Sequence, residues 1–270
     1  MSAPAPTNLE FCKTPPPEIK FQGQAWLGIT MQPYIQLFGP AHLIILVTVP
    51  ALAAAFAILQ RRLPPGSAIL RRVLGLLLLA DATIYNGYLI AKDTPAFPNH
   101  LPLQLCDASV CLVILSLLFP NRTVFDLAYY VALAGASMAL ITPNLWEPFP
   151  SYGTVQFFVV HGSIVAGVLH LVWSGLARPR PGSVWVAMLG VNVYAACVGA
   201  FDAIFKTNYM YLRAKPANAS LLDLLGPWPW YIAWGEIIAL VIFQLLYLPF
   251  RFRAAAEQTQ VGKQGSGNQN

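Results

Sequence analysis

The sequence predicts an all-helical, polytopic membrane protein with about seven transmembrane spans. Hydrophobic residues make up 57% of its 270 residues, and charged residues make up only 10%. A soluble globular domain contains about 45–50% hydrophobic residues and about 25% charged residues. Apolar stretches close to the roughly 20 residues needed to cross a bilayer recur from residue 37 to residue 250. These observations exclude a water-soluble fold. The net charge of +5 does not indicate nucleic-acid binding, because basic residues flanking the spans of a membrane protein set its orientation.

Proline, glycine and arginine residues divide the apolar sequence into seven segments. The predicted spans cover residues 37–59, 73–90, 101–119, 124–141, 155–176, 184–205 and 230–250. We therefore expect three regions. They are a Pro-rich N-terminal segment (1–36) containing a stretch suited to an interfacial helix, a seven-helix transmembrane domain (37–253) and a disordered C-terminal tail (254–270).

The distribution of basic residues predicts the orientation. When the connections alternate between two sides, ten basic residues fall on one side: four in 60–72, Arg122, two in 178–183 and three after residue 250. The other side carries six. The positive-inside rule then places the N-terminus outside and the C-terminus in the cytoplasm. The first 40 residues lack a basic region followed by an apolar one, so we expect no cleavable signal peptide.

Many polar residues lie within the predicted spans, where an ionised group costs at least about 2.5–3.5 kcal/mol. They are His42, Asp81, Asn86, Gln104, Asp107, Asp126, Gln156, His161, His170, Asn192, Asp202 and Glu236. They cannot all face lipid, so we expect the bundle to enclose a polar cavity. The candidates for cavity or substrate-binding residues are Gln104, Asn192, Asp202, Asp81, Tyr85, Asn208 and Tyr209.

Several of these candidates also have a structural interpretation. Asp81 and Tyr85 share one helical face, which would form either a hydrogen-bonded packing seam or a cavity wall. Asp202 and Lys206 are spaced as an i,i+4 pair that would close the end of a helix. The long connection over residues 207–229 would serve either as an aromatic anchor at the interface or as a lid over a site.

The four cysteines form no CxxC pair, and three of them lie in apolar segments, so we expect no disulfide framework, metal site or cofactor. Cys106 has a different potential role, because it lies beside Asp107 just after Pro102 and could meet His161 of another span. A histidine that takes the proton of a thiol forms the minimal acyl-transfer pair, and a carboxylate can orient the ring. The structural alternative is a cysteine that packs as a small hydrophobe and a histidine that is hydrogen-bonded in place.

Helical geometry complicates the simplest arrangement of this catalytic set. On an ideal helix Cys106 points about 100° away from Asp107. Either Cys106 faces a different neighbour, or Pro102 leaves this stretch irregular. His161 shares its face with apolar side chains, which favour a neutral ring able to accept a proton.

Three segments, LPLQLCD, FPSYGTVQFFVVHGS and TNYMYLRAKPANASLLDLLGPWPWY, resemble the YwaF-like family of bacterial integral membrane proteins. Eukaryotic transmembrane relatives of that family are proposed lipid acyltransferases that use an intramembrane cysteine. The resemblance thus implies a bacterial inner-membrane protein with membrane lipids, including an acyl-donor lipid, as partners. Cys106 would match the cysteine of the family and His161 its histidine.

Three functions remain open at this point. The first is a lipid acyltransferase in which Cys106 is the nucleophile, His161 the general acid and base, and Asp107 or Asn192 the polar support. The second is a small-solute or proton-coupled transporter that uses the intramembrane carboxylates. An odd span count and the lack of an internal repeat disfavour this alternative. The third is a scaffold without catalytic activity.

Overall fold

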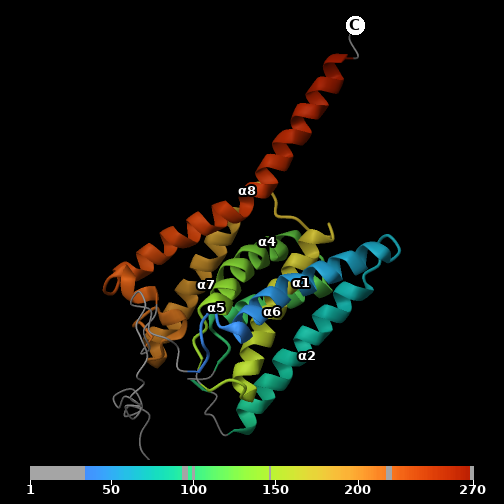
Figure 1. Cartoon of the computed structure of the whole chain (residues 1–270). Helices are drawn as coiled ribbons and strands as arrows, with labels where there is room; N and C mark the ends of the chain where they lie inside the picture. The colour runs from blue at the N-terminus through green and yellow to red at the C-terminus, as the bar shows by residue number, and fades with distance from the viewer. Residues whose placement is uncertain (1–33, 93–96, 99–100, 146, 217–220, 268–270) are drawn as a thin grey trace, which may run out of the picture.

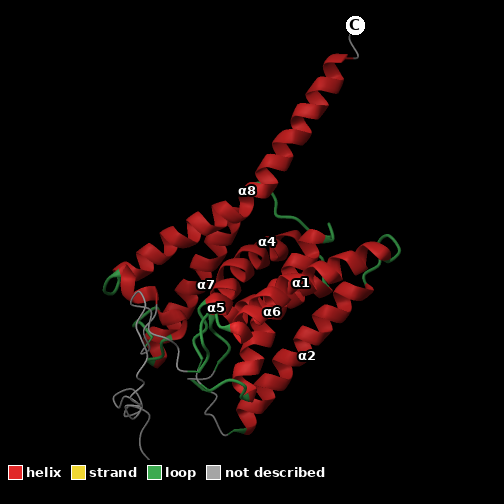
Figure 2. Ribbon diagram, in the orientation of Figure 1, coloured by secondary structure: helices red, strands yellow, loops and turns green. Residues whose placement is uncertain are grey.

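The computed structural model describes residues 34–92, 97–98, 101–145, 147–216 and 221–267 (Figure 1). The Pro-rich segment predicted for residues 1–36 lies almost entirely outside this range. The described residues form helices and loops without any strand (Figure 2). The predicted all-helical fold class is confirmed.

Eight α-helices and three shorter helical turns follow one another along the described chain. They are α1 (Pro40–Arg62), α2 (Ile69–Ala91), α3 (Leu105–Leu118), α4 (Arg122–Val131), the π-helical turn η1 (Ala132–Ala136), α5 (Ser137–Ile141), α6 (Tyr152–Trp173), α7 (Ser183–Phe205), the 3-10 turns η2 (Tyr209–Tyr211) and η3 (Leu221–Leu225), and α8 (Trp230–Gly267). The last helix extends away from the bundle (Figure 1) and continues into the region for which the sequence predicts a tail.

Six helical segments are long and apolar enough to cross a membrane. They are Pro40–Arg62, Ile69–Ala91, Arg122–Ile141, Tyr152–Trp173, Ser183–Phe205 and Trp230–Phe252. The third predicted span is shorter than expected, because α3 has 14 residues and is therefore about 21 Å long, against about 30 Å for the hydrocarbon core. The predicted count of seven full-length spans is not confirmed, and the orientation of the termini remains a prediction.

The helix α6 lies at the centre of the bundle and contacts α1, α2, α3, η1 and α5. Within its most apolar 18-residue window, 61% of residues are buried, against 11% in the corresponding windows of α2 and α8. Large apolar side chains on the outer helices are exposed, among them Ile44, Leu77 and Leu189. These faces suit contact with lipid, which has no need of polar partners.

Small residues allow the central helices to approach closely. A Cβ atom at Gly162 of α6 would lie 3.0 Å from Val49 Cγ2 of α1. A Cβ atom at Gly167 would lie 3.1 Å from Val113 Cγ1 of α3. Close backbone approach at glycine is the usual way in which membrane helices pack, since van der Waals contact replaces the hydrophobic effect there.

A buried histidine ties the start of α1 to the end of α5. The amide of Phe38 donates to His42 Nδ1 at 2.9 Å, and His42 Nε2 donates to the carbonyl of Leu140 at 2.8 Å. Both ring nitrogens are therefore used, and the side chain is fully buried. The location of His42 is explained by structure, without any need for a role in chemistry.

The packing of α2 on α3 can be tested at Gly75. A Cβ atom at Gly75 would lie 2.8 Å from Leu118 Cδ2 and 3.0 Å from Leu117 Cβ. We expect Gly75→Val to destabilise the protein by about 1–3 kcal/mol through overpacking, which a thermal unfolding assay in detergent would show as a lower Tm. Gly87→Val on the same helix is the control, because nothing lies within 4 Å of a Cβ atom there. An equal loss of Tm in both variants would contradict the packing argument.

Candidate functional site

The start of α3 is fixed by a reciprocal cap that uses two of the predicted site residues. Gln104 is the N-cap residue, and its amide donates to Asp107 Oδ2 at 3.0 Å while its side chain accepts from the backbone of Asp107. Such a capping box satisfies two otherwise unpaired N–H groups at a helix start. The carboxylate of Asp107 thus holds the helix end that carries Cys106, and among the described residues it is not hydrogen-bonded to His161.

The helices α3 and α6 run in the same direction. Near the start of α2, Arg71 Nη1 donates to the carbonyl of Leu117 at the end of α3, at 2.6 Å. Toward the end of α2, the ring of Tyr88 lies 4.6 Å from that of Tyr152 at the start of α6. Because α2 is antiparallel to both helices, α3 and α6 are parallel to each other.

This parallel arrangement sets the depth of Cys106. Val113 faces Gly167 of α6, and Cys106 precedes Val113 by seven residues, which is about two turns and within about 20° of the same face. On ideal helices we therefore expect Cys106 on the side of α3 that faces α6. The same two turns counted back from Gly167 lead to Val160, so we expect Cys106 near the level of Val160 and of His161 beside it.

His161 is buried on α6 with one ring nitrogen committed. Its Nδ1 lies 2.7 Å from the carbonyl of Phe157, and because a carbonyl only accepts, Nδ1 carries a proton. In the neutral ring Nε2 is then the nitrogen with the free lone pair. His161 is turned by about 120° around α6 from Gly167, and the hydrogen bonds of the described residues do not join it to Cys106.

The turn η2 brings an aromatic hydroxyl close to Cys106. Met210 and Tyr211 both have left-handed backbone conformations, with φ of 53° and 55°, which bulky residues rarely adopt. Tyr211 is hydrogen-bonded to the side chain of Asn144 and lies near enough to Cys106 to interact electrostatically, as does Tyr194 of α7. Strained residues of this kind persist where the surrounding structure holds them, often at functional sites.

Burial raises the pKa of the Tyr211 phenol above its ordinary value, and the nearby Cys106 raises the pKa further, while the hydrogen bond with Asn144 opposes the shift. The phenol of free tyrosine titrates near pH 10. The hydroxyl of Tyr211 is therefore protonated at neutral pH and can donate a hydrogen bond.

The backbone after α7 is organised by Asp202, whose side chain is fully buried. Asp202 Oδ1 accepts from the hydroxyl of Thr207 at 2.6 Å and from the amide of Tyr209 at 3.0 Å. The predicted i,i+4 partner, Lys206, instead caps α7 in a left-handed conformation and is exposed. Within the described part of the chain Asp202 makes no ion pair with Lys206, so it shapes the loop that leads to η2.

Tyr209 and Asn208 complete this loop. The amide of Leu101 donates to the hydroxyl of Tyr209 at 2.8 Å, and that hydroxyl donates to the carbonyl of Pro98 at 2.8 Å. Asn208 Nδ2 donates to the carbonyl of Ala214 at 2.8 Å. Tyr209 thus joins the segment before α3 to the segment after α7, whereas Asn208 holds the loop after α7 together.

A direct contact links this loop to the cap of α3. Gln104 Oε1 accepts from the amide of Met210 at 2.9 Å, so the strained turn and the first turn of α3 are held together. The hydroxyl of Tyr231 at the start of α8 donates to the carbonyl of Tyr211 at 2.5 Å. Three elements therefore converge beside Cys106.

The remaining predicted cavity residues lie at two other helix interfaces. Asp81 Oδ2 accepts from Gln156 Nε2 at 3.4 Å, and Tyr85 belongs to an aromatic cluster with Tyr88 and Tyr152. Both residues line the seam between α2 and α6. Asn192 Nδ2 donates to the carbonyl of Met188 and to Glu236 Oε2, each at 2.9 Å, so it joins α7 to α8.

The carboxylates proposed for a transport relay are distributed among separate local roles. Asp107 belongs to the cap of α3, Asp126 is paired with Arg180 at 2.7 Å, and Asp202 organises a loop. Among the described residues, no three His, Cys, Asp or Glu side chains gather as a group that could hold a metal ion. In the described part of the chain these three carboxylates have separate partners and do not bond to one another.

A comparison with known protein families matches residues 37–247 of the chain to the TMEM164 family. The chain belongs to the TMEM164 family. The match covers nearly the whole of the helical bundle, including both Cys106 and His161. No curated protein and no solved structure matches the chain.

This assignment corrects the resemblance drawn from the sequence. TMEM164 is a family of eukaryotic transmembrane proteins, so the assignment to a bacterial YwaF-like family is wrong. The expectation of a bacterial inner membrane rested on that assignment and loses its basis. Family membership and the apolar helices together show that the TMEM164 family protein is an integral membrane protein.

The sequence did not point to Tyr211 and Tyr194 as neighbours of Cys106, or to Asn144 as the partner of Tyr211. All three belong to elements distant from α3 in the chain. Tyr211 does lie in the segment TNYMYLR, at the start of the long connection expected to form an interfacial anchor or a lid. A left-handed conformation at two successive non-glycine residues has no sequence signal, so only the structure of the TMEM164 family protein could show it.

The loop next to Cys106 can be tested at Tyr209. We expect Tyr209→Phe to destabilise the protein by about 1–3 kcal/mol, because the amide of Leu101 loses its buried acceptor. Thermal unfolding of the purified protein measures the effect. Tyr152→Phe is the control at the same end of the bundle, since Tyr152 is exposed and makes aromatic contacts that the substitution keeps. The argument fails if Tyr209→Phe unfolds at the temperature of the wild type.

Proposed function

We propose that this TMEM164 family protein transfers an acyl chain between membrane lipids through a thioester on Cys106. The observation that supports it is the contact of Val113 with Gly167, because continuing this register on ideal helices brings Cys106 toward α6 near the level of His161. A thiol and a neutral imidazole at one depth are the two groups that acyl transfer requires. The exposed apolar faces of the outer helices suit a substrate that arrives laterally from the bilayer.

The first half of the reaction forms the acyl-enzyme. His161 Nε2 takes the proton of the Cys106 thiol, directly or through one water, and the thiolate attacks the ester carbonyl of the donor lipid. The tetrahedral intermediate collapses with cleavage of the ester C–O bond. The leaving lysolipid alkoxide takes the proton from His161, which leaves a thioester on Cys106.

The second half regenerates the enzyme. The hydroxyl of an acceptor lipid gives its proton to His161 and attacks the thioester carbonyl, and the C–S bond breaks. The Cys106 thiolate then recovers the proton from His161. The bond between His161 Nδ1 and the carbonyl of Phe157 keeps the same nitrogen available in both halves.

Tyr211 is suited to stabilise the charge that develops on the carbonyl oxygen. Its hydroxyl lies near Cys106 and is held by Asn144 and by a strained turn. A donor that is positioned in advance costs no reorganisation when the oxyanion forms. The capping box and the Gln104 contact with Met210 hold this geometry from the side of α3.

Substitution of the proposed nucleophile and base tests the chemistry. We expect Cys106→Ala and His161→Gln to abolish acyl exchange between phospholipid and lysophospholipid in proteoliposomes, because no thioester forms without the thiol or its base. A lipid-like alkylating probe should label Cys106 in the wild type. Mass spectrometry of the lipids and of the labelled peptide provides both readouts.

Cys111→Ala is the matched control, because Cys111 lies on the same helix but is exposed. It should retain the activity of the wild type and the labelling of Cys106. Full activity in Cys106→Ala would overturn the proposal.

The role of Tyr211 is tested by Tyr211→Phe, which removes the hydroxyl and keeps the ring. We expect kcat to fall by about 10²–10³-fold, as for loss of one oxyanion donor, while alkylation of Cys106 continues. Because burial raises the pKa of Tyr211, the wild type should keep this contribution up to the ordinary phenol range near pH 10 and lose it only above. An unchanged kcat in Tyr211→Phe would remove Tyr211 from the mechanism.

A further inference from the structure

A large cavity opens at the end of the bundle opposite Cys106. It has a volume of about 1060 Å³ and is lined by residues of α2, α3, α4, α6 and α8 and by the segment before α7. Ser116 of α3 belongs to its wall. Ten residues separate Ser116 from Cys106, which corresponds to about 15 Å along the helix. This cavity is therefore distinct from the proposed acyl-transfer site.

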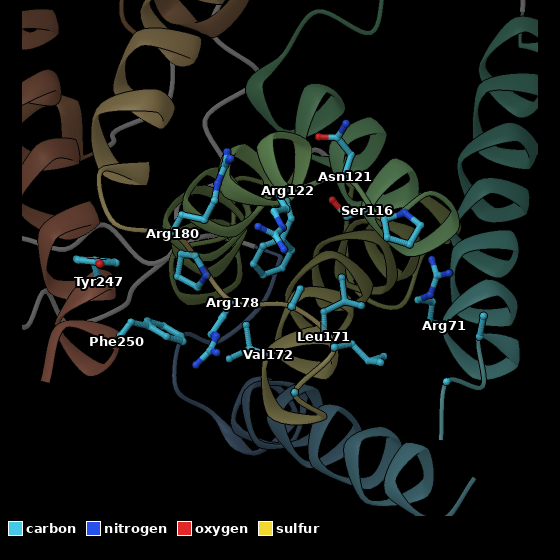
Figure 3. Close-up of a pocket in the computed structure, with 18 of the residues that line it drawn as sticks. Arg71, Ser116, Asn121, Arg122, Leu171, Val172, Arg178, Arg180, Tyr247 and Phe250 are labelled. Atoms are coloured by element: carbon cyan, nitrogen blue, oxygen red, sulfur yellow. The ribbon is translucent and has the colours of Figure 1, made fainter. Parts of the chain in front are cut away.

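Four arginines and no acidic residue line this cavity, which we call the arginine pocket. Arg71 projects from α2 on one side, and Arg178 and Arg180 lie across the opening on the segment before α7, with Arg122 between them (Figure 3). Their guanidinium groups thus come from three separate parts of the chain. A concave surface with one sign of charge concentrates ligands of the opposite sign.

The partners of Arg180 and Arg71 define the roles of these two arginines. Arg180 Nε lies 2.7 Å from Asp126 Oδ2, and Arg180 Nη2 donates to the hydroxyl of Thr123 at 3.0 Å. This pair fixes the segment that carries Arg178. Arg71 is buried and donates to the carbonyl of Leu117, and in the part of the chain that the structure describes no carboxylate lies within ion-pair distance of it.

A buried cation that is hydrogen-bonded to a carbonyl but not paired with a carboxylate has an uncompensated positive charge. An anionic ligand can compensate that charge. The guanidinium of arginine presents several N–H donors in a fixed plane that matches phosphate oxygens. Much of the remaining wall is apolar, with Leu171 and Val172 near Arg178 and with Tyr247 and Phe250 to the side (Figure 3). The pocket combines an anion-binding rim with an apolar wall, as an amphipathic anion requires.

The position of the pocket in the bundle supports a ligand from the membrane surface. Arginines are concentrated at this end, where α1 ends and α2 begins, whereas Lys92, Lys206 and Lys215 lie at the other end. The positive-inside rule predicts that the arginine-rich end is cytoplasmic. The cytoplasmic leaflet carries the anionic lipids that basic pockets between membrane helices bind.

We propose that the arginine pocket binds the phosphate of an anionic ligand, with Arg122 and Arg178 at its rim and Arg71 at its base. The shared chemistry is a phosphate monoester or inorganic phosphate dianion, supplied either by a lipid headgroup or by free phosphate. The apolar wall beside the arginines favours the lipid, whose glycerol backbone and first acyl carbons it would cover. This site is independent of the acyl-transfer proposal, which stands or falls on Cys106.

The test measures binding of dioctanoyl phosphatidic acid to the detergent-purified full-length protein, followed by intrinsic tryptophan fluorescence or thermophoresis. We expect saturable binding that becomes about 30-fold weaker in Arg122→Gln/Arg178→Gln, at about fivefold for each guanidinium. Both residues are exposed, so the double variant should fold, and its Tm is recorded as a check.

Arg62→Gln/Arg72→Gln is the matched control, since both arginines are exposed at the same end of the bundle and neither lines the pocket. It removes the same charge and should bind like the wild type. Dioctanoyl phosphatidylcholine should bind weakly, and inorganic phosphate separates the two sources. If inorganic phosphate binds as tightly as the lipid, the ligand is free phosphate; if it does not, the ligand is the lipid headgroup.

Equal affinity in the wild type and the pocket double variant would overturn the proposal. An equal loss in the pocket and control variants would also overturn it, because the attraction would then come from the charge of the whole surface. Neither result would affect acyl transfer by Cys106.

Discussion

The fit of α6 into its neighbours is the constraint on which the other features depend. Glycines at positions 162 and 167 let the backbones of α1 and α3 approach it closely, and the volume around them leaves no freedom to slide along the helix axis. A shift of one turn would place larger side chains where the glycines now lie. The depth of each neighbouring helix is thus set by steric fit, and the depth of Cys106 relative to His161 follows from it.

Many polar groups in the bundle have local partners, whereas both ring nitrogens of His170 and Asp202 Oδ2 are buried without a hydrogen-bond partner among the described residues. Asp107 caps a helix, Asp126 holds Arg180, Asp202 shapes a loop and His42 bridges two backbone groups. Each removes the cost of an unpaired backbone or charged group in a poorly hydrated region. These carboxylates of the predicted acid-rich interior thus have separate structural roles, and the groups that the proposed chemistry uses are a thiol, an imidazole and a phenol.

Much of the fold could be predicted from the sequence, because apolar length and flanking arginines are strong local signals. The predicted spans agree with α1, α2, α6, α7 and α8 to within a few residues at most ends. The third span was predicted too long, since its apolar residues begin before the cap at Gln104 that starts the helix. The angle of about 100° between Cys106 and Asp107 on an ideal helix also has a local explanation. Asp107 points into the capping box, and Cys106 is not needed on the same face. The contact partners themselves depend on tertiary packing, and no periodicity encodes them. The bacterial family assignment failed for another reason, because it rested on short motifs, whereas the TMEM164 match extends over residues 37–247.

The shortness of α3 has a consequence for where in the bilayer chemistry can take place. A helix of 14 residues falls about 9 Å short of the hydrocarbon thickness, so the lipid must thin around it or headgroups and water must descend to meet its first turn. Cys106 lies on that turn. The thiol would then meet the glycerol esters of the lipids and not the middle of their chains, and exchangeable protons would be close by. The short helix thus allows the polar boundary region of the membrane to reach the cysteine within the bundle.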